Sequence, residues 1–524
     1  MLVLESQHTI PLKIRYFVLS FRQDIAFFMG IIQRQGILGT IASYIGVLIG
    51  MFNVLWLYPK FLQPEEIGLI RGLTDAASII VPLMVLGVPH MCIRYFPMFK
   101  NEARQHYGLL TFMLLVPIMG FTLFAGLFYL SSDWLFGFFS EKSALFSEYL
   151  YLLPLLCFFM MYYSVLESYS RSLHKIAVPV FINESLVRVG VTAIVLLYAA
   201  GWVTRSSWLS LYVVIYGASM LLIGLYIKSL GQWFVPLSID KAIRIKIPEM
   251  GNYAFFVLLG SVGAMMVGKI DSLMVIKLSG LSDGGVYSIA LFIGTVIEIP
   301  RRVLSQISAP LVAHQIANNQ MKELAGLYSR ISINQTLAGL LLLLCIWANI
   351  DNLFALMPNG QLYSAGKYVV LFIGLAKLID MSTSINNEII TLSKYYRYHL
   401  LMMLFLVSLT IIANLILIPR LGITGAALAT LITLFAFNLL KYIFIWVTMK
   451  MQPFTTQTGM AFLVAGIIFM VHYFLPFLFN VWVDLFLRSF IVGGLFITAI
   501  LLLRLSPDAN RIVLKLWNTT LKRK

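Results

Sequence analysis

Charged side chains inside long apolar stretches are the residues of this sequence that could do chemistry. Lys269 and Asp271 lie together in one such stretch, at about 252–276. An ionisable side chain in membrane hydrocarbon costs at least a few kcal/mol, so it needs a partner, a water-filled cavity or a function. Residues two apart point about 200° away from each other around a helix. Lys269 and Asp271 therefore cannot pair with each other, and we expect each to contact another helix or water.

Three further groups of charged residues have a spacing of three or four, which places them on one face of a helix. They are Glu184 with Arg188, Glu298 with Arg301 and Arg302, and Lys377 with Asp380. Each pair either neutralises itself for insertion into a membrane or forms part of a polar cavity wall. The spacing leaves both interpretations open.

The two signs of charge suggest two kinds of ligand. Buried cations can bind an anionic group such as a diphosphate, and the candidates are Arg188, Lys269, Arg301, Arg302 and Lys377. Buried carboxylates can bind a proton or a sodium ion whose gradient drives transport. The candidates for this coupling are Asp271, Glu298 and Asp380.

The sequence contains no motif for catalysis, metal binding or nucleotide binding. Neighbouring residues assemble no Ser–His–Asp triad, no metal-ligand cluster and no pair of catalytic carboxylates, and the three cysteines show no paired spacing. Residues 263–270 (GAMMVGKI) match most of a phosphate-binding loop, but they lack the final Ser or Thr and lie in an apolar stretch. We therefore predict no catalytic residue, no bound metal and no cofactor, and a transporter in place of an enzyme.

The composition indicates where these charges are positioned. Of the 524 residues, 60% are apolar and 11% are charged, whereas soluble domains are about 45–50% apolar and about 25% charged. This excludes cytosolic enzymes, secreted disulfide scaffolds and disordered chains. The formal net charge of +16 would suggest nucleic acid as a partner of a soluble protein. In a chain this apolar it indicates basic loops on one side of a membrane, and no nucleic acid.

The apolar runs predict an all-α membrane protein with fourteen transmembrane helices, because about 20 apolar residues cross the hydrocarbon. The runs lie at about 37–59, 74–96, 108–130, 147–168, 177–199, 208–228, 252–276, 286–311, 331–349, 366–389, 399–418, 423–447, 458–476 and 482–503. The segment 16–32 is interrupted by polar residues and predicts a helix lying on the membrane surface.

The distribution of Lys and Arg predicts the orientation. With an even number of spans, 24 of the 38 basic residues fall on the side of the termini, seven on the other side and seven inside spans. Loops rich in Lys and Arg stay in the cytoplasm. We therefore predict that both termini are cytoplasmic.

An internal repeat divides the chain. Lys60 and Gly68 are eight residues apart, as are Lys277 and Gly285, and the two pairs are offset by 217 residues. This predicts two parallel six-helix halves related by an axis along the membrane normal, as in transporters that rock two bundles. The predicted parts are a cytoplasmic N-terminus with the surface helix (1–36), an N-lobe (37–229), a cytoplasmic loop (230–250), a C-lobe (251–447), two extra helices (448–503) and a basic cytoplasmic tail (504–524).

Four stretches carry a resemblance to a known family. They are 34–37 (RQGI), 58–62 (YPKFL), 65–69 (EEIGL) and, most specifically, 414–427 (NLILIPRLGITGAA). Together with the six-plus-six-plus-two layout, the chain resembles the polysaccharide transporter branch, the Wzx-type flippases, of the multidrug/oligosaccharidyl-lipid/polysaccharide exporter superfamily.

The resemblance implies a V-shaped transporter with two lobes around a central cavity. Its substrate would be an oligosaccharide on a polyprenyl diphosphate, such as an O-antigen, capsule or exopolysaccharide unit, moved across the membrane by alternating access. Its partners would be this lipid-linked oligosaccharide, membrane lipids, and the polymerase and chain-length proteins of polysaccharide assembly, with the transporter itself a monomer. The family has no strict signature at its substrate residues, so the candidates above rest on burial and charge.

Three alternatives remain open. A lipid II flippase has the same helix count and a cationic cavity. A drug or cation exporter of the same superfamily has twelve helices and favours an acidic cavity. A membrane glycosyltransferase or polymerase is disfavoured, because the outer loops are too short for a catalytic domain.

Overall fold

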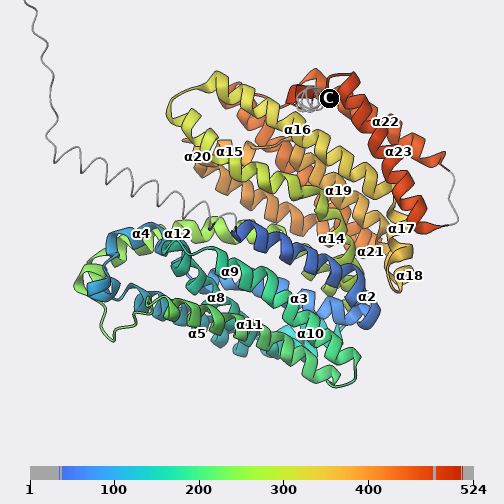
Figure 1. Ribbon diagram of the computed structural model, residues 1–524. Helices are drawn as coiled ribbons and strands as arrows, with labels where there is room; N and C mark the ends of the chain where they lie inside the picture. The colour runs from blue at the N-terminus through green and yellow to red at the C-terminus, as the bar shows by residue number, and fades with distance from the viewer. Residues whose placement is uncertain (1–34, 36–37, 476–479, 509, 512–524) are drawn as a thin grey trace, which may run out of the picture. The chain divides into compact units, whose positions relative to one another are not determined.

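The computed structural model describes residues 35, 38–475, 480–508 and 510–511, and within some helices it leaves single side chains, including that of Arg302, undescribed. The secondary structure of the described residues is entirely helical (Figure 1). The predicted surface helix at 16–32 lies outside the described residues, as does the end of the basic tail.

The described chain forms two compact units. The first comprises the chain up to Phe52, Gly87–Met119 and Phe159–Ala254, and the second comprises Asn53–Leu86, Gly120–Phe158 and the chain from Phe255 onward. These units interleave along the sequence, whereas the predicted lobes are continuous. The predicted division at 230–250 stays a prediction.

The first unit contains helices of the first predicted half and the beginning of the helix that follows it. They are α4 (Val88–Phe99), η2 (Glu102–Gly108), α9 (Ala177–Phe181), η4 (Ile182–Leu186), α10 (Val187–Ala199) and α11 (Arg205–Ser229), with parts of α5 (Leu109–Leu130), α8 (Leu153–Ser172) and α12 (Lys241–Val267). Edge-on ring contacts of Phe96 with His106 and with Tyr169 form an aromatic centre in this unit.

The second unit begins with the elements between Asn53 and Leu152. They are η1 (Asn53–Leu57), α2 (Tyr58–Phe61), α3 (Pro64–Met84), α6 (Ser132–Ser140), α7 (Ala144–Tyr149) and η3 (Leu150–Leu152). The α3 helix begins ten residues before the predicted span at 74, because Pro64 occupies its first turn and Gln63 and Glu66 form a capping box there. Glu65 and Glu66 suggest a loop in the sequence, yet carboxylates are favourable at a helix N-terminus.

The rest of the second unit is the C-terminal half of the chain. Its elements are α13 (Ile270–Leu278), α14 (Leu281–Thr295), η5 (Val296–Glu298), α15 (Ile299–Ala317), α16 (Met321–Ala348), α17 (Ile350–Leu356), α18 (Gly360–Tyr363), η6 (Ser364–Gly366), α19 (Lys367–Ser382), α20 (Asn386–Leu392), α21 (Tyr396–Met449), α22 (Thr456–Tyr473) and α23 (Val481–Leu502). Helices α22 and α23 pack against α16 and against each other (Figure 1). Buried residues from α16, α19, α22 and α23 form one apolar core.

Twelve helices among the described residues are long and apolar enough to cross a membrane. One of them is the 54-residue α21, whose length of about 80 Å far exceeds the roughly 30 Å of hydrocarbon. Gly422 interrupts it with φ 58° and ψ −138°, between the predicted spans 399–418 and 423–447. The predicted seventh span is divided between α12 and α13, and α12 is not among the twelve. The exact count of fourteen stays a prediction.

Candidate functional site

Four of the predicted site residues form one ion-pair network in the second unit. Glu298 ends the short 3₁₀ turn η5, Arg301 lies in the first turn of α15, and Lys377 and Asp380 lie on α19. Lys377 Nζ is 2.7 Å from Glu298 Oε2, and Arg301 Nη1 is 3.4 Å from Glu298 Oε1. Arg301 also pairs with Asp380. We call these four residues the charge network.

Local sequence explains how η5 and α15 present these charges. Pro300 occupies the first turn of α15, where its missing N–H leaves no hydrogen bond unmade. The chain passes from α14 through η5 into α15 without leaving a helical path, so Glu298 and Arg301 are held on neighbouring turns.

One predicted pairing is wrong. Lys377 and Asp380 are three residues apart, but their ion pairs run across to Glu298 and to Arg301. The acid and the base on α19 each have an oppositely charged partner on η5 or α15, so the network ties neighbouring segments together. The side chain of Arg302 lies outside the described residues.

The charge network extends to residues that the sequence analysis did not name. Lys441 on α21 is fully buried, its Nζ donates to Asn387 Oδ1 at 3.1 Å, and it lies 4.0 Å from the ring centre of Phe437. Glu388 on α20 accepts a hydrogen bond from Ser305 on α15. Lys441 is within electrostatic range of Asp380, Arg301 and Glu388. Lys441 is one of the seven cations counted inside predicted spans. The apolar residues around it in the sequence were the signal that could have identified it as a buried charge.

Lys269 and Asp271 have separate partners, as predicted. Lys269 lies at the junction of α12 and α13, and its Nζ is 2.8 Å from Asp75 Oδ1 on α3. Asp75 is fully buried and also pairs with Arg71 at 2.7 Å. The predicted span began at 74, which left Arg71 in a loop and Asp75 at the end of the span, so neither residue was a candidate.

Asp271 accepts two hydrogen bonds from α21. Asn414 Nδ2 lies 2.6 Å from its Oδ1, and Thr430 Oγ1 lies 2.7 Å from its Oδ2. The two donors lie on opposite sides of the interruption at Gly422. Among the described residues, Asn414 Oδ1 has no hydrogen-bond partner although it is buried. A carboxylate with an amide oxygen and a hydroxyl beside it offers oxygen ligands to a small cation.

Arg188, the remaining candidate, lies in the first unit and pairs with Glu184 at 2.7 Å, as the spacing predicts. Each of the two side chains is 34% exposed. Two glycines of the helix Leu38–Phe61 lie beside this pair: a Cβ at Gly46 would be 2.3 Å from the Glu184 carbonyl oxygen, and one at Gly50 would be 3.3 Å from Arg188. This pair belongs to the first unit and the charge network to the second.

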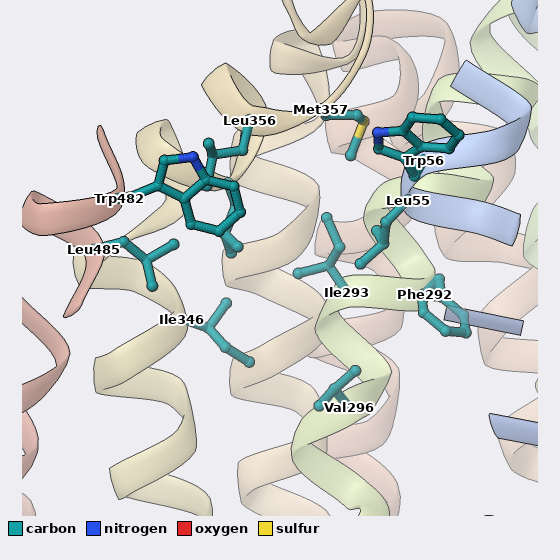
Figure 2. A pocket seen from close by; sticks show the side chains of 11 residues that line it. Leu55, Trp56, Phe292, Ile293, Val296, Ile346, Leu356, Met357, Trp482 and Leu485 are labelled. Carbon is teal, nitrogen blue, oxygen red and sulfur yellow. The ribbon is translucent and has the colours of Figure 1, made fainter. Parts of the chain in front are cut away.

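An apolar cavity of about 350 Å³ lies within the second unit. Its lining comes from η1, α14, η5, α16, α17 and α23: Leu55, Trp56, Phe292, Ile293, Val296, Ile346, Leu353, Leu356, Met357, Trp482 and Leu485. Figure 2 shows the indoles of Trp56 and Trp482 towards one end of this cavity and Val296 at the opposite end. Val296 and Glu298 belong to the same 3₁₀ turn, so η5 contributes to both the cavity and the charge network.

A buried ion pair on α23 also escaped the sequence analysis. Arg488 Nε lies 2.6 Å from Asp484 Oδ2, and Asp484 accepts a further hydrogen bond from Asn352 Nδ2 at 2.7 Å. Its spacing of four equals that of Glu184 and Arg188, and this spacing was the signal that could have found it.

Comparison with solved structures gives the fold. The chain matches "Lipid II flippase MurJ, inward closed conformation" with a TM-score of 0.68 and 14% identity, over 88% of this chain and 98% of that one. It matches "Inward-facing conformation of a multidrug resistance MATE family transporter of the MOP superfamily" with a TM-score of 0.59 and 14% identity, over 77% and 94%.

A third match is "Reverse polarity of binding pocket suggests different function of a MOP superfamily transporter from Pyrococcus furiosus Vc1 (DSM3638)". Its TM-score is 0.52 at 14% identity, over 80% of this chain and 95% of that one. No protein-family model and no curated protein sequence matches the chain. At this identity the likeness concerns the fold, and the chain has the all-helical membrane-transporter fold that the lipid II flippase MurJ and the MATE transporters share.

Proposed function

We propose that this protein flips a polyprenyl-diphosphate-linked oligosaccharide across the bacterial cytoplasmic membrane by alternating access. One observation carries the proposal: the turn η5 joins an apolar cavity to a network of charges. Val296 lines the cavity, and two residues later Glu298 pairs with Lys377 and Arg301. A lipid diphosphate has the same two parts, an apolar chain and a compact charged head.

The cavity suits the apolar part of such a substrate. Its lining consists of aliphatic and aromatic side chains and Met357, which provide contact area without demanding hydrogen bonds. The indoles of Trp56 and Trp482 stand near one end (Figure 2). Tryptophan is enriched where hydrocarbon meets the polar membrane surface.

The charge network suits the head, but its cations are already paired. Each of the four described candidate cations, Arg188, Lys269, Arg301 and Lys377, has a carboxylate partner. A diphosphate must therefore compete with Glu298 and Asp380 for Arg301 and Lys377. Protonation of Glu298 or Asp380 would weaken these pairs and release the cations for the diphosphate.

This competition supplies a route for ion coupling. In the charge network, the predicted head-binding residues Arg301 and Lys377 are paired with the predicted coupling residues Glu298 and Asp380. A proton that binds a carboxylate would favour substrate binding, and loss of the proton would favour release. Asp271, with Asn414 and Thr430 around it, is a separate candidate for binding a proton or a sodium ion.

Two other substrates follow from the comparisons. MurJ acts on lipid II, another lipid diphosphate, and the same features of this chain suit it equally. A drug or cation exporter of the MATE type is favoured by one observation: each of the four described candidate cations is matched by a carboxylate partner. Protonatable carboxylates in such a network could also accept an organic cation.

The decisive experiment measures binding to the purified full-length protein in detergent, using native mass spectrometry. The probes are farnesyl diphosphate, farnesol, inorganic diphosphate and tetraphenylphosphonium. We expect farnesyl diphosphate to bind roughly tenfold or more tightly than farnesol or inorganic diphosphate alone, because both parts of the site contribute. Preferential binding of tetraphenylphosphonium would instead support a cation exporter.

Matched variants locate the head site. Lys377→Gln should weaken binding of farnesyl diphosphate and leave that of farnesol unchanged, whereas Lys377→Arg should retain both. Lys367→Gln is the control, because Lys367 also pairs with a carboxylate, Asp351 at 2.7 Å, but lies outside the charge network. Equal effects of Lys377→Gln and Lys367→Gln would count against the head site.

A further inference from the structure

Helices α3 and α14 approach each other so closely that their contact has room only for glycine. A Cβ at Gly68 on α3 would lie 2.1 Å from the carbonyl oxygen of Leu281, and one at Gly285 on α14 would lie 1.9 Å from that of Pro64. Real Cβ contacts are essentially never shorter than 3.0 Å. Both glycines are buried and both helices belong to the second unit. We call this the glycine contact.

The glycine contact is symmetric in sequence. Pro64 and Leu281 are the first residues of α3 and α14, and they differ by 217, as do Gly68 and Gly285. Each glycine therefore meets the carbonyl of the residue four positions before the other glycine. Such an exchange of equivalent residues is the property of an interface around a two-fold axis. The sequence repeat and the three-dimensional contact give the same symmetry independently.

We propose that the glycine contact is the closed outer gate of the transport cycle, and that Gly68 and Gly285 determine whether the gate can close. The inference rests on the proposed function, since a transporter that alternates access must separate on one side the helices that pack there in the other state. Helices α3 and α14 belong to different predicted halves, and both begin on the side predicted to be external. Their contact is one of those by which the two predicted halves meet on that side.

The chemistry of the contact suits repeated opening. Backbone against backbone gives close packing with Cα–H···O contacts. Two neighbouring glycines leave room for side chains of α13 and α7: a Cβ at Gly284 would be 2.6 Å from Ile276, and one at Gly72 would be 2.6 Å from Ile276 and 2.7 Å from Phe146. Deeper along α3, opening would also separate Asp75 from Lys269, an ion pair that joins the same two predicted halves.

Accessibility of a cysteine beneath the contact tests the proposal. Ser288 on α14 is buried and lies about one helical turn beyond Gly284 and Gly285, on the same face. Ser288→Cys is introduced into full-length protein whose three native cysteines are replaced by serine, and its alkylation by a maleimide is followed in detergent. Gly285→Leu and Gly68→Leu should each raise the alkylation rate roughly tenfold or more, because the gate cannot close.

The matched control is Gly126→Leu on α5, where an added Cβ meets no atom within 4 Å; it should leave the rate unchanged. Gly285→Ala and Gly68→Ala are included in case a leucine variant fails to fold. They should also raise the alkylation rate, by a smaller factor than the leucine variants. Thermal unfolding identifies folded variants. Alkylation rates in folded Gly285→Ala and Gly68→Ala that equal the rate in Gly126→Ala would overturn the gate.

The experiment separates the gate from the substrate. Alkylation needs no ligand, so faster alkylation without binding of farnesyl diphosphate leaves the gate standing and contradicts the proposed substrate. Unchanged alkylation with normal binding contradicts the gate and leaves the proposed substrate standing.

Discussion

Two ion pairs in this protein have the same sequence spacing and different surroundings. Glu184 on η4 pairs with Arg188 on α10, and Asp484 pairs with Arg488 on α23. Both are acid–arginine pairs four residues apart, with N–O distances of 2.7 and 2.6 Å. The side chains of Glu184 and Arg188 are each 34% exposed, whereas those of the α23 pair are 1% and 10% exposed. In these two cases the spacing along the helix brings the charges together, and the neighbouring helices determine how deeply each pair is buried.

The charge network adds a further set of ion pairs to this comparison of exposed and buried charges. Its ion pairs link α19 to η5 and α15, and the side chains of Arg301 and Asp380 are 13% and 12% exposed. A buried ion whose partner is removed keeps its cost of desolvation, while an exposed ion is rehydrated by water. Burial should therefore rank the effects of removing each charge, whatever the sequence spacing.

The largest effect is expected from Arg301→Met. Arg301 pairs with both Glu298 and Asp380, so its loss leaves two carboxylates without this cation. We expect the free energy of unfolding in detergent to fall by about 3–5 kcal/mol, measured by chemical unfolding. Arg188→Met on α10 is the control and should change it by less than about 1 kcal/mol. Similar losses in both variants would show that burial does not rank these pairs.

The next effect compares the two pairs of equal spacing directly. Asp484→Asn leaves Arg488 buried without its carboxylate and weakens the hydrogen bond from Asn352. We expect a loss of about 2–3 kcal/mol, against about 0.5 kcal/mol for Glu184→Gln. Thermal unfolding of the two purified variants checks the order. A larger loss for Glu184→Gln would mean that the pair of Glu184 with Arg188 has the greater structural role.

A smaller effect measures the coupling across helices. Glu298→Lys and Lys377→Glu each place like charges together, and the double variant restores an ion pair with reversed polarity. We expect a coupling energy of about 1–2 kcal/mol from the double-mutant cycle. The cycle of Lys377 with Asp380 should give a smaller coupling, since the ion pairs of these residues run to other partners. Equal coupling in both cycles would restore the pairing that spacing alone predicts.

The sequence predicts those features that depend on local properties, and it does not predict those that depend on how helices pack. Apolar runs and residue spacing are local properties, so they predicted a helical membrane protein, the pairing of Glu184 with Arg188 and the separate partners of Lys269 and Asp271. Lys377 and Asp380 pair with Glu298 and Arg301 because η5 and α15 pack against α19. A single sequence does not show how these segments pack. Lys441 and Asp484 were missed for a different reason: the apolar surroundings of Lys441 and the spacing of four between Asp484 and Arg488 were visible in the sequence and were not used.

The glycine contact shows that a repeat can predict more than its residues suggest. The offset of 217 was found from Lys60, Gly68, Lys277 and Gly285, and it indicated two related halves. That the related glycines touch each other could not be read from the spacing, because a repeat specifies similar structures and not their mutual contact.

The smallest expected effect lies at the C-terminal end, where the pairing is exposed and can be titrated. Arg330 on α16 donates through Nε to Asp508 Oδ2 at 2.6 Å and also pairs with Oδ1, and Asn334 donates to the same carboxylate. The Arg330 side chain is 58% exposed. Hydrogen bonding from Arg330 holds the pKa of Asp508 below its ordinary value.

A carboxylate whose pKa is lowered in the folded state stabilises the fold above its unfolded pKa, and this contribution is lost as the pH falls through the folded pKa. Asp508→Asn should therefore cost less than about 1 kcal/mol at pH 7, with the difference from the unmodified protein disappearing in acid below the folded pKa. Thermal unfolding at pH 7 and at pH values through the acid range measures this. A difference that grows in acid, or a loss at pH 7 as large as that of Arg301→Met, would contradict the ranking by burial, because Asp508 and Arg330 form a close, well-aligned pair in an exposed setting.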